Sequence, residues 1–186
     1  LNDMSLEQRV GQLFLARCDD NYALEHIETY HLGGFVLFGR DFNGQTPDSF
    51  REKIARYQAA AELPLLIAVD EEGGTVTRVS SNPAFRSKRF PSPRSLYESS
   101  GLETVLVCEK EKCLLLSSLG INVNMGPVCD ITTDPNAFLY RRSLGASPEI
   151  TAEYIRDTVR EMNSNRIGSC LKHFPGYGNN ADTHTG

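Results

Sequence analysis

Apolar runs with the length of buried strands alternate along this chain with stretches of helical periodicity. The runs lie at 13–16, 35–38, 65–69, 121–124 and 167–171, and the helical stretches fall between them. Nearly continuous apolar strands are typical of a parallel sheet that is covered by helices. The alternation therefore favours two architectures, a doubly wound open sheet or an eight-fold (β/α) barrel.

Helix signals between these runs follow the same plan. Ser5 and Gln8 have the spacing of a capping box, and Thr46 followed by Pro47 is typical of the start of a helix. Apolar residues then recur at helical spacing in each stretch. We predict helices over 5–12, 22–31, 46–61, 102–119 and 148–163.

Polar side chains follow the predicted strands at the point where each strand ends. Asp41, Asp70 and Lys172 each come directly or shortly after an apolar run, and the polar segment 124–130 follows another. Charged or amide groups at the carboxyl ends of successive strands are typical of a (β/α)-barrel active site. This second regularity favours the barrel over the open sheet.

Length and missing motifs define the fold prediction further. The glycine fingerprint of a dinucleotide-binding sheet is absent, and so is the P-loop pattern. A complete barrel needs roughly 250 residues, whereas this chain has 186 residues and about five strand signals. We therefore predict an α/β fold, a TIM-like (β/α)8 barrel, of which residues 1–186 form the N-terminal portion of a single domain.

Composition and charge exclude several classes of protein. The formal net charge is −5 with no block of Lys or Arg, which argues against binding nucleic acid by charge. No apolar run approaches the roughly 20 residues that span a bilayer, so no membrane partner is expected. The five cysteines show no CxxC pair and no zinc-ligand spacing. We expect reduced thiols in a cytoplasmic protein, with no metal and no cofactor.

The segment 172–184 carries the strongest chemical signal. Lys172 and His173 follow the last predicted strand, and glycines after them let the backbone approach a ligand closely. Asp182 can accept a hydrogen bond from one ring nitrogen of His184, which leaves the other nitrogen free to exchange a proton with substrate. The alternative is a turn with a solvated His184, which the strand end and the Lys172-His173 pair disfavour.

Two further segments could bind polar groups. Asp70 ends a predicted strand, where its carboxylate can accept two sugar hydroxyls and Arg78 can add a donor, although a glycine turn with solvated acids is an equal alternative. The three acids at 70–72 lack a further metal ligand of convincing spacing. Arg142 suits hydroxyl, carboxylate or phosphate groups, but alone it is more typical of a surface turn. Asp130 is interpreted as a loop-forming residue with local hydrogen bonds.

Together these motifs resemble those of family-three glycoside hydrolases, specifically the β-N-acetylglucosaminidase branch. The resemblance runs through nearly the whole chain, and its last motifs are highly specific because order, spacing and strand placement agree. The motifs are MSLEQRVGQL at 4–13, GGFVLF at 33–38, DEEGG at 70–74 with Arg78, NVNMGPVCD at 122–130, RSLG at 142–145, KHFPG at 172–176 and DTH at 182–184.

The resemblance implies a retaining exo-glycosidase that removes terminal non-reducing β-linked N-acetylglucosamine through a covalent glycosyl-enzyme intermediate. It implies His184 as general acid/base and Asp182 as its orienting partner. The family's nucleophile is an aspartate on a later strand, beyond residue 186, so we expect the chain to end in the acid/base loop and to be inactive alone. Tyr177 stands where the family more often has His. The implied sugar-binding residues are Asp70, Arg78, Arg142, Lys172 and His173.

The resemblance leaves substrate and acceptor open. Peptidoglycan muropeptides and chitin oligosaccharides are both implied substrates, and some relatives use phosphate instead of water. A β-glucosidase of the same family is one alternative, against which the Asp182/His184 pair counts. A non-catalytic sugar-binding half-barrel is the other, although its unpaired sheet edge counts against it. We expect a small carbohydrate substrate and the remainder of the barrel, in the same or a second chain, as partners.

Overall fold

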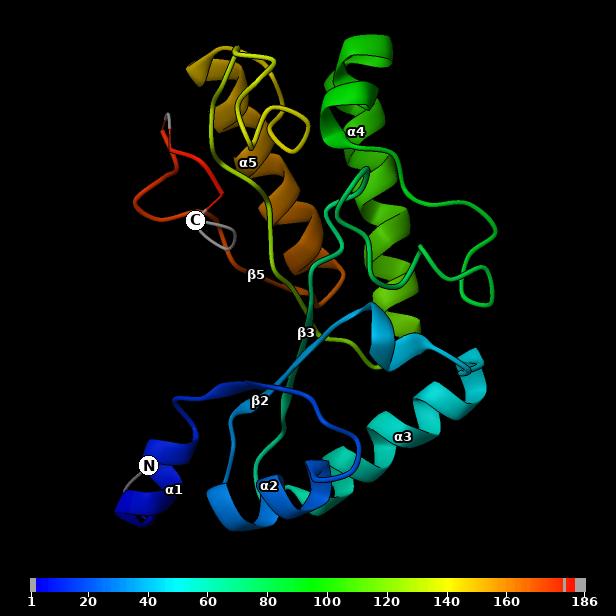
Figure 1. The fold of residues 1–186 in the computed structure, drawn as a ribbon, viewed down its shortest axis with the longest axis vertical. Helices are drawn as coiled ribbons and strands as arrows, with labels where there is room; N and C mark the ends of the chain where they lie inside the picture. The colour runs from blue at the N-terminus through cyan, green and yellow to red at the C-terminus, as the bar shows by residue number, and fades with distance from the viewer. Residues whose placement is uncertain (1–2, 179, 183–186) are drawn as a thin grey trace.

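The computed structural model describes residues 3–178 and 180–182, and its strands and helices alternate along the chain (Figure 1). The strands are β1 (Leu15–Arg17), β2 (Gly34–Leu37), β3 (Leu66–Val69), β4 (Val123–Asn124) and β5 (Gly168–Ser169). The helices are α1 (Leu6–Gly11), α2 (Ala23–Tyr30), the 3-10 helix η1 (Gly39–Phe42), α3 (Pro47–Ala60), α4 (Pro93–Ser118) and α5 (Pro148–Ser164).

The strands form one parallel sheet whose spatial order equals their order along the chain, β1-β2-β3-β4-β5. The register pairs Leu37 of β2 with Val69 of β3, and Val69 with Asn124 of β4. Sequential parallel strands are those of a (β/α)-barrel wall, whereas a doubly wound sheet reverses its order at a switch point. The predicted fold, the N-terminal part of such a barrel, is confirmed.

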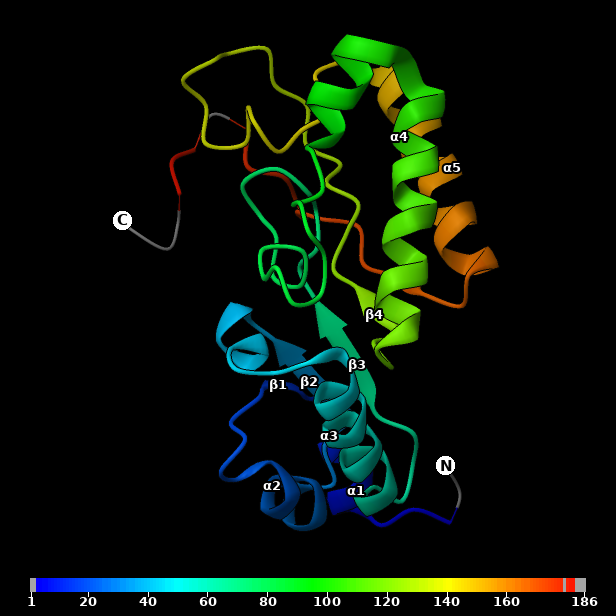
Figure 2. The same ribbon diagram turned by 90° about the vertical axis from the view of Figure 1, so that its right-hand side faces the viewer.

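Helices pack against this wall and close the core. In both ribbon views α4 and α5 lie side by side, and α2 packs near α3 at the opposite end of the molecule (Figures 1 and 2). Phe35 and Ile67 from the strands and Phe50 from α3 are fully buried in the main core. Burying an apolar side chain of this size stabilises the fold by about 1.5–3 kcal/mol. This core fixes the strand ends that carry the polar residues.

Helix α4 begins at Pro93, earlier than the predicted start near residue 102. The hydroxyl of Ser92 accepts a hydrogen bond from the backbone N–H of Ser95 at 3.2 Å, and Pro93 suits the first helical turn. Gly101 has φ 79° within the helix, a left-handed conformation that breaks the regular geometry there. The helical periodicity after Gly101 revealed only the second part of this helix.

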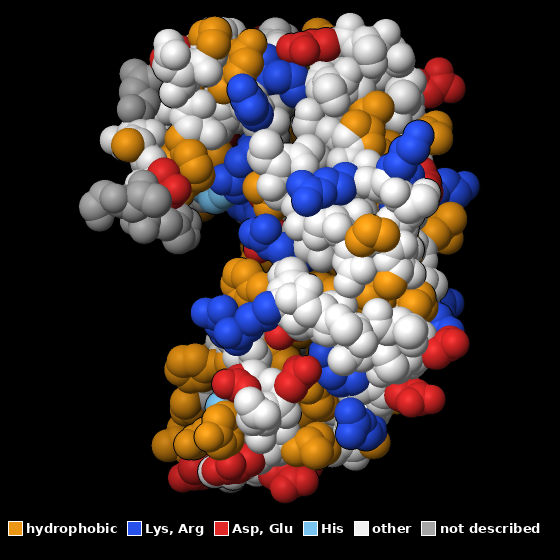
Figure 3. All heavy atoms as spheres, turned by 45° about the vertical axis from the view of Figure 1, so that its right-hand side comes forward, with side chains coloured by type: hydrophobic (Ala, Val, Ile, Leu, Met, Phe, Trp, Pro, Cys, Tyr) orange, Lys and Arg blue, Asp and Glu red, His pale blue; other side chains and the backbone are white. Residues whose placement is uncertain are grey.

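The barrel wall is open at its two edge strands, β1 and β5. Leu13 and Phe14, directly before β1, are 83% and 57% exposed. Figure 3 shows a hollow on one side of the molecule with Lys and Arg side chains along its wall, and hydrophobic side chains gathered at the end that holds α1 and α2. Of the helices in the described ranges, none has the length and apolar composition needed to cross a membrane.

Candidate active site

Polar side chains from separate segments meet at the carboxyl edge of the sheet, beside β3, β4 and β5. Asp70 directly follows β3, and Lys172 pairs with Val128 beyond the ends of β5 and β4. Because the strands are parallel, their carboxyl ends lie at the same edge and bring together residues that are far apart in sequence. We call this cluster the rim network. Its members are Asp70, Glu72, Asp130, Arg142, Lys172 and His173.

Lys172 lies between two carboxylates. Its Nζ is 2.6 Å from Oδ1 of Asp70 and 2.5 Å from Oε1 of Glu72. The Lys172 side chain is only 13% exposed, so its charge is balanced by these partners more than by water. The structure thus brings together the sequence-predicted Asp70 and Lys172, and it adds Glu72, which the sequence analysis did not single out.

Arg142 makes a two-pronged contact with the same carboxylate. Its Nε donates to Oε2 of Glu72 at 2.9 Å, and its Nη2 donates to Oε1 at 2.8 Å. Nη2 also lies 3.2 Å from Nε2 of His173. Such a bidentate pair fixes the plane of the guanidinium, which an isolated surface arginine lacks. The surface-turn alternative for Arg142 is therefore wrong.

His173 is held by Asp130 from the other side. Its backbone N–H and its ring Nδ1 lie 3.0 and 2.7 Å from Oδ2 of Asp130, and the Tyr177 N–H donates to Oδ1 at 2.9 Å. Because Arg142 can only donate, Nε2 of His173 accepts a hydrogen bond from Arg142, and Nδ1–H donates one to Asp130. Asp130 therefore does more than form local hydrogen bonds: it orients the His173 ring.

The pKa values of these groups follow from their pairing. Burial opposes ionisation of Glu72, but the hydrogen bonds from Arg142 and the charge of Lys172 outweigh it and hold the pKa of Glu72 below its usual value. Burial would lower the pKa of Arg142, yet the Glu72 carboxylate raises it. Burial likewise opposes the ionisation of Asp130, and hydrogen bonds from Tyr177 and His173 lower its pKa. Both carboxylates are therefore ionised at neutral pH.

Glu71 has a structural role next to the network. It is fully buried, and its Oε2 accepts the backbone N–H groups of Arg78 at 2.8 Å and Val79 at 2.7 Å. A carboxylate that accepts several backbone N–H groups fixes the loop that donates them. The alternative of solvated acids after Asp70 is wrong for both Glu71 and Glu72, since both are buried.

Arg78 lies beside the network but makes no ion pair with it in the described ranges. Its guanidinium carbon is 5.9 Å from the centre of the Phe38 ring, within the range of a cation–π contact. Phe38 and Asp70 directly follow the paired residues Leu37 and Val69, so the two strand ends are neighbours. Within the described structure, the buried Nε of Arg78 has no hydrogen-bond partner.

The loop after His173 carries the remaining residues of the predicted site. Tyr177 packs edge-on against the His173 ring, with 4.9 Å between the ring centres. A cavity of about 350 Å³ opens beside Asp130, His173 and Gly176. Asp182 is partly buried in this loop, and His184 lies outside the described residues. The pairing of Asp182 with His184 therefore stays a prediction.

Comparison with known families matches this chain along almost its whole length. The family described as glycosyl hydrolase family 3 N terminal domain matches residues 5–186. The chain belongs to this family. This membership confirms the resemblance inferred from the motifs, and it agrees with a wall of parallel strands that carries polar side chains at its carboxyl edge.

Two curated relatives show how much of a family-3 protein this chain represents. Beta-hexosaminidase A of Pseudoalteromonas piscicida is 33% identical over 171 residues, which are 87% of this chain and 28% of that protein. Beta-hexosaminidase LpqI of Mycobacterium tuberculosis is 29% identical over 186 residues, which are 98% of this chain and 46% of that protein. The chain thus spans less than half the length of these curated relatives.

Solved structures show the same relation to family 3. A glycoside hydrolase family 3 beta-N-acetylglucosaminidase from Paenibacillus sp. matches with a TM-score of 0.84 and 31% identity, over 97% of this chain and 35% of that one. NagZ from Neisseria gonorrhoeae, solved in complex with N-trifluoroacetyl-D-glucosamine, matches with a TM-score of 0.71 and 25% identity, over 91% of this chain and 50% of that one.

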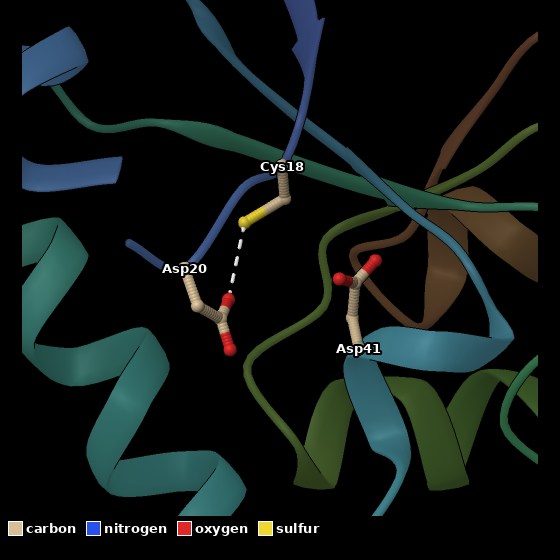
Figure 4. Close-up of side chains that lie close together, drawn as sticks. All are labelled: Cys18, Asp20 and Asp41. Atoms are coloured by element: carbon tan, nitrogen blue, oxygen red, sulfur yellow. Dashed lines mark hydrogen bonds between the residues drawn. The ribbon is translucent and has the colours of Figure 1, made fainter. Parts of the chain in front are cut away.

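A second polar cluster of this family-3 chain lies at the ends of β1 and β2. Ligand atoms of Cys18, Asp20 and Asp41 lie within 4.8 Å of one another (Figure 4). The Lys53 ammonium already supplies a cation, 3.1 Å from Asp20 and 2.9 Å from the Asp41 carbonyl oxygen. Burial, with the charges of Asp20 and Asp41, raises the pKa of Cys18 to about 12, so the thiol is protonated. The arrangement does not favour a metal ion.

Proposed function

We propose that this chain is the sugar-binding part of a retaining exo-glycosidase that hydrolyses terminal, non-reducing β-linked N-acetylglucosamine. The rim network carries the proposal: two cations, three carboxylates and an oriented imidazole converge where a family-3 barrel wall ends. Relatives named beta-hexosaminidase and a solved beta-N-acetylglucosaminidase support the choice of sugar. NagZ, solved with an N-acylated glucosamine, supports it further.

The network has the groups that sugar hydroxyls require. A hydroxyl both donates and accepts, so Asp70 can accept its proton while Lys172 or Arg142 donates to its oxygen. The side chains of Asp70 and His173 are 22% and 24% exposed, so each can reach a bound ligand. Hydrogen bonds of this kind that strengthen as the oxocarbenium-like transition state forms lower the barrier to glycoside cleavage.

The acid/base work falls to His184 and Asp182 in this proposal. In the first step the bond from the anomeric carbon to the leaving oxygen breaks, His184 protonates that oxygen, and an aspartate in the second half of the barrel bonds to the carbon. In the second step His184 takes a proton from water, whose oxygen replaces the aspartate. An imidazole avoids a second negative charge beside the anionic nucleophile. Phosphate could take the place of water in the second step.

The second half of the barrel completes both the site and the fold. The curated relatives are more than twice the length of the matched region, and their longer chains hold the rest of the domain. We propose that the missing strands close the wall between β1 and β5 and cover the apolar surface beside β1. Without them the nucleophile is absent, so the 186 residues alone should not turn over substrate. That apolar surface includes Leu6, Val10, Leu13, Phe14 and Tyr30.

The proposed substrate class is defined by its terminal sugar, N-acetylglucosamine, and not by the group to which that sugar is linked. Peptidoglycan muropeptides and chitin oligosaccharides both carry N-acetylglucosamine, so both are candidate substrates. For tests we use the complete barrel protein, meaning this chain together with the second half of its barrel. Muropeptide and chitin-oligosaccharide hydrolysis by that protein can be compared directly by separating the products.

The experiment that tests the proposal compares two chromogenic substrates. We expect the complete barrel protein to release nitrophenol from 4-nitrophenyl N-acetyl-β-glucosaminide with a kcat/KM at least about 100-fold above that on 4-nitrophenyl β-glucoside, since a site built for one polar group rejects analogues that lack it. Equal rates, or a preference for the glucoside, would support the β-glucosidase alternative. Sugar binding without turnover of either substrate would support a non-catalytic protein.

A further inference from the structure

We propose that Glu72 is the positioning residue of the rim network: its carboxylate sets the spacing of Arg142 and Lys172, and through them the preference for one hydroxyl configuration of the sugar. The inference rests on the proposed function, because it concerns how the same site reads its sugar. Glu72 itself is 4% exposed, so it acts through its partners and not by contact with a ligand.

One carboxylate oxygen holds both cations. Oε1 of Glu72 lies 2.8 Å from Nη2 of Arg142 and 2.5 Å from Nζ of Lys172. Oε2 accepts the second prong of the guanidinium at 2.9 Å. The two cations come from segments on either side of α5, and Glu72 is the group that both of them contact. A single side chain therefore bridges the two cations.

The backbone of Glu72 is itself fixed. Its N–H donates to the carbonyl of Val76 at 3.0 Å. Its carbonyl accepts from Nζ of Lys112 at 3.2 Å, and that ammonium is 2.6 Å from Oε2 of Glu109. Both Lys112 and Glu109 are buried on α4. The buried Lys112–Glu109 ion pair on α4 thus holds the backbone of Glu72 in place, and the Glu72 side chain in turn binds the two cations.

The charges explain why the anchor matters. Two cations that bind one oxygen atom repel each other strongly in a site with little water. A negative charge on that oxygen attracts both cations and offsets the repulsion. Asp70 also contacts Lys172, at 2.6 Å, but it is the more exposed carboxylate and the one available to a hydroxyl. Without the charge on Glu72, Lys172 would turn further toward Asp70 and Arg142 would lose its bidentate partner.

Displaced cations should change selectivity more than they change folding. A hydroxyl-reading site rejects the wrong epimer because one of its polar groups is then left unpaired. If Arg142 and Lys172 can move, that penalty shrinks. The change to examine is therefore the ratio of kcat/KM on gluco-configured to galacto-configured N-acetylhexosaminides, which differ only in the orientation of one hydroxyl.

The test uses the Glu72→Gln variant of the complete barrel protein. We expect kcat/KM on the gluco substrate to fall by about 10²- to 10³-fold, as for loss of a preorganised donor. We expect the gluco-to-galacto ratio of kcat/KM to fall at least about fivefold, because the polar groups that reject the galacto epimer are no longer held in place. Asp157→Asn is the matched control: Asp157 also bridges two arginines, Arg156 and Arg160 of α5, but these side chains are 51% and 71% exposed. We expect that variant to keep both values.

Glu72→Asp provides a second variant that keeps the charge but shortens the side chain by one methylene. If Glu72→Gln does not fold, as judged by circular dichroism, Glu72→Asp must still lower the selectivity ratio. A proportionate loss on both epimers, with an unchanged ratio in a folded variant, would show a merely structural role and overturn the inference. Failure of the unmodified protein on every N-acetylhexosaminide would instead overturn the proposed function.

Discussion

Two polar clusters lie at the same carboxyl edge of the sheet, and they differ in where their cations come from. In the rim network, Arg142 and Lys172 belong to loops and strand ends, and they bind acids next to the cavity beside Asp130 and His173. In the cluster at β1 and β2, Lys53 belongs to the covering helix α3 and reaches Asp20 from outside the wall.

This difference separates the proposed sugar-binding arrangement from a structural one. Lys53 is 4% exposed and joins α3 to Asp20 and to the carbonyl of Asp41, while Tyr57 on the same helix donates to Asp20 at 2.9 Å. Such contacts attach a helix to a strand end. In the rim network Arg142 and Lys172 both contact the Glu72 carboxylate, so their donor groups converge there. Acids at barrel strand ends are therefore not equivalent, and the origin of the cation distinguishes them.

The largest expected effect concerns the acid/base pair beyond β5. In the complete barrel protein, His184→Ala should slow glycosides with poor leaving groups by about 10²- to 10⁴-fold, the usual range for a general acid. Nitrophenyl glycosides should slow far less, because their leaving groups need little protonation. Asp182→Asn should also lower activity by misorienting the imidazole. An equal loss on both substrate classes would contradict acid catalysis by His184.

Lys172→Met tests the rim side of the comparison. It removes a proposed donor to the sugar, and it takes away the ammonium that both Asp70 and Glu72 contact. We expect kcat/KM to fall by about 10²- to 10³-fold, the range for loss of a preorganised donor. Steady-state kinetics on the N-acetylglucosaminide measure the effect. A fall of less than tenfold in a folded variant would contradict a sugar-binding role for this edge.

Lys53→Met tests the other side of the comparison. We expect the free energy of unfolding to fall by about 2 kcal/mol, less than for a fully buried pair because Asp20 is half exposed. The kcat/KM of the folded protein should stay within about twofold, since surface and structural changes away from the chemistry leave the site intact. Urea denaturation and kinetics on the same preparation measure both. A large kinetic loss with unchanged stability would reverse the assignment of the two clusters.

The smallest expected effect is the acid dependence of stability. The pKa of Asp130 is lowered in the folded protein, so its stabilising contribution is complete above its unfolded pKa of about 3.9 and is lost as pH falls through the lower folded value. We expect the stability difference between the unmodified protein and Asp130→Asn to shrink below about pH 4. Urea midpoints from pH 6 to pH 3 measure it. A difference independent of pH would show that Asp130 acts without its charge.

The sequence predicted the fold well because alternation and strand-end polarity are local signals. Five parallel strands in chain order follow from them. The start of α4 was not predicted, because the Ser92-Pro93 signal lies before Gly101, which interrupts the helical geometry. Gly101 is a kink between two helical segments, and the periodicity predicted only the second of them.

The site was only partly predictable, because its members are joined over long stretches of sequence. Asp70, Arg142, Lys172 and His173 were singled out, and the structure places them together. Glu72 was missed among three adjacent acids, since its partner Arg142 is 70 residues away.

Asp130 was interpreted too locally, because His173, the partner it orients, is 43 residues away in sequence. The only sequence signal for this pairing was the position of each residue shortly after a predicted strand: parallel strand ends meet at one edge of the sheet.

The most direct test is a crystal structure of the complete barrel protein with N-acetylglucosamine bound. We expect the hydroxyls of the sugar to lie within hydrogen-bond distance, about 2.7–3.2 Å, of Asp70, Arg142, Lys172 or His173, with Glu72 beneath them and out of contact. We expect no sugar at the Cys18, Asp20 and Asp41 cluster. A sugar bound at that cluster, or one that makes no contact with the rim network, would contradict a sugar-binding role for the rim network.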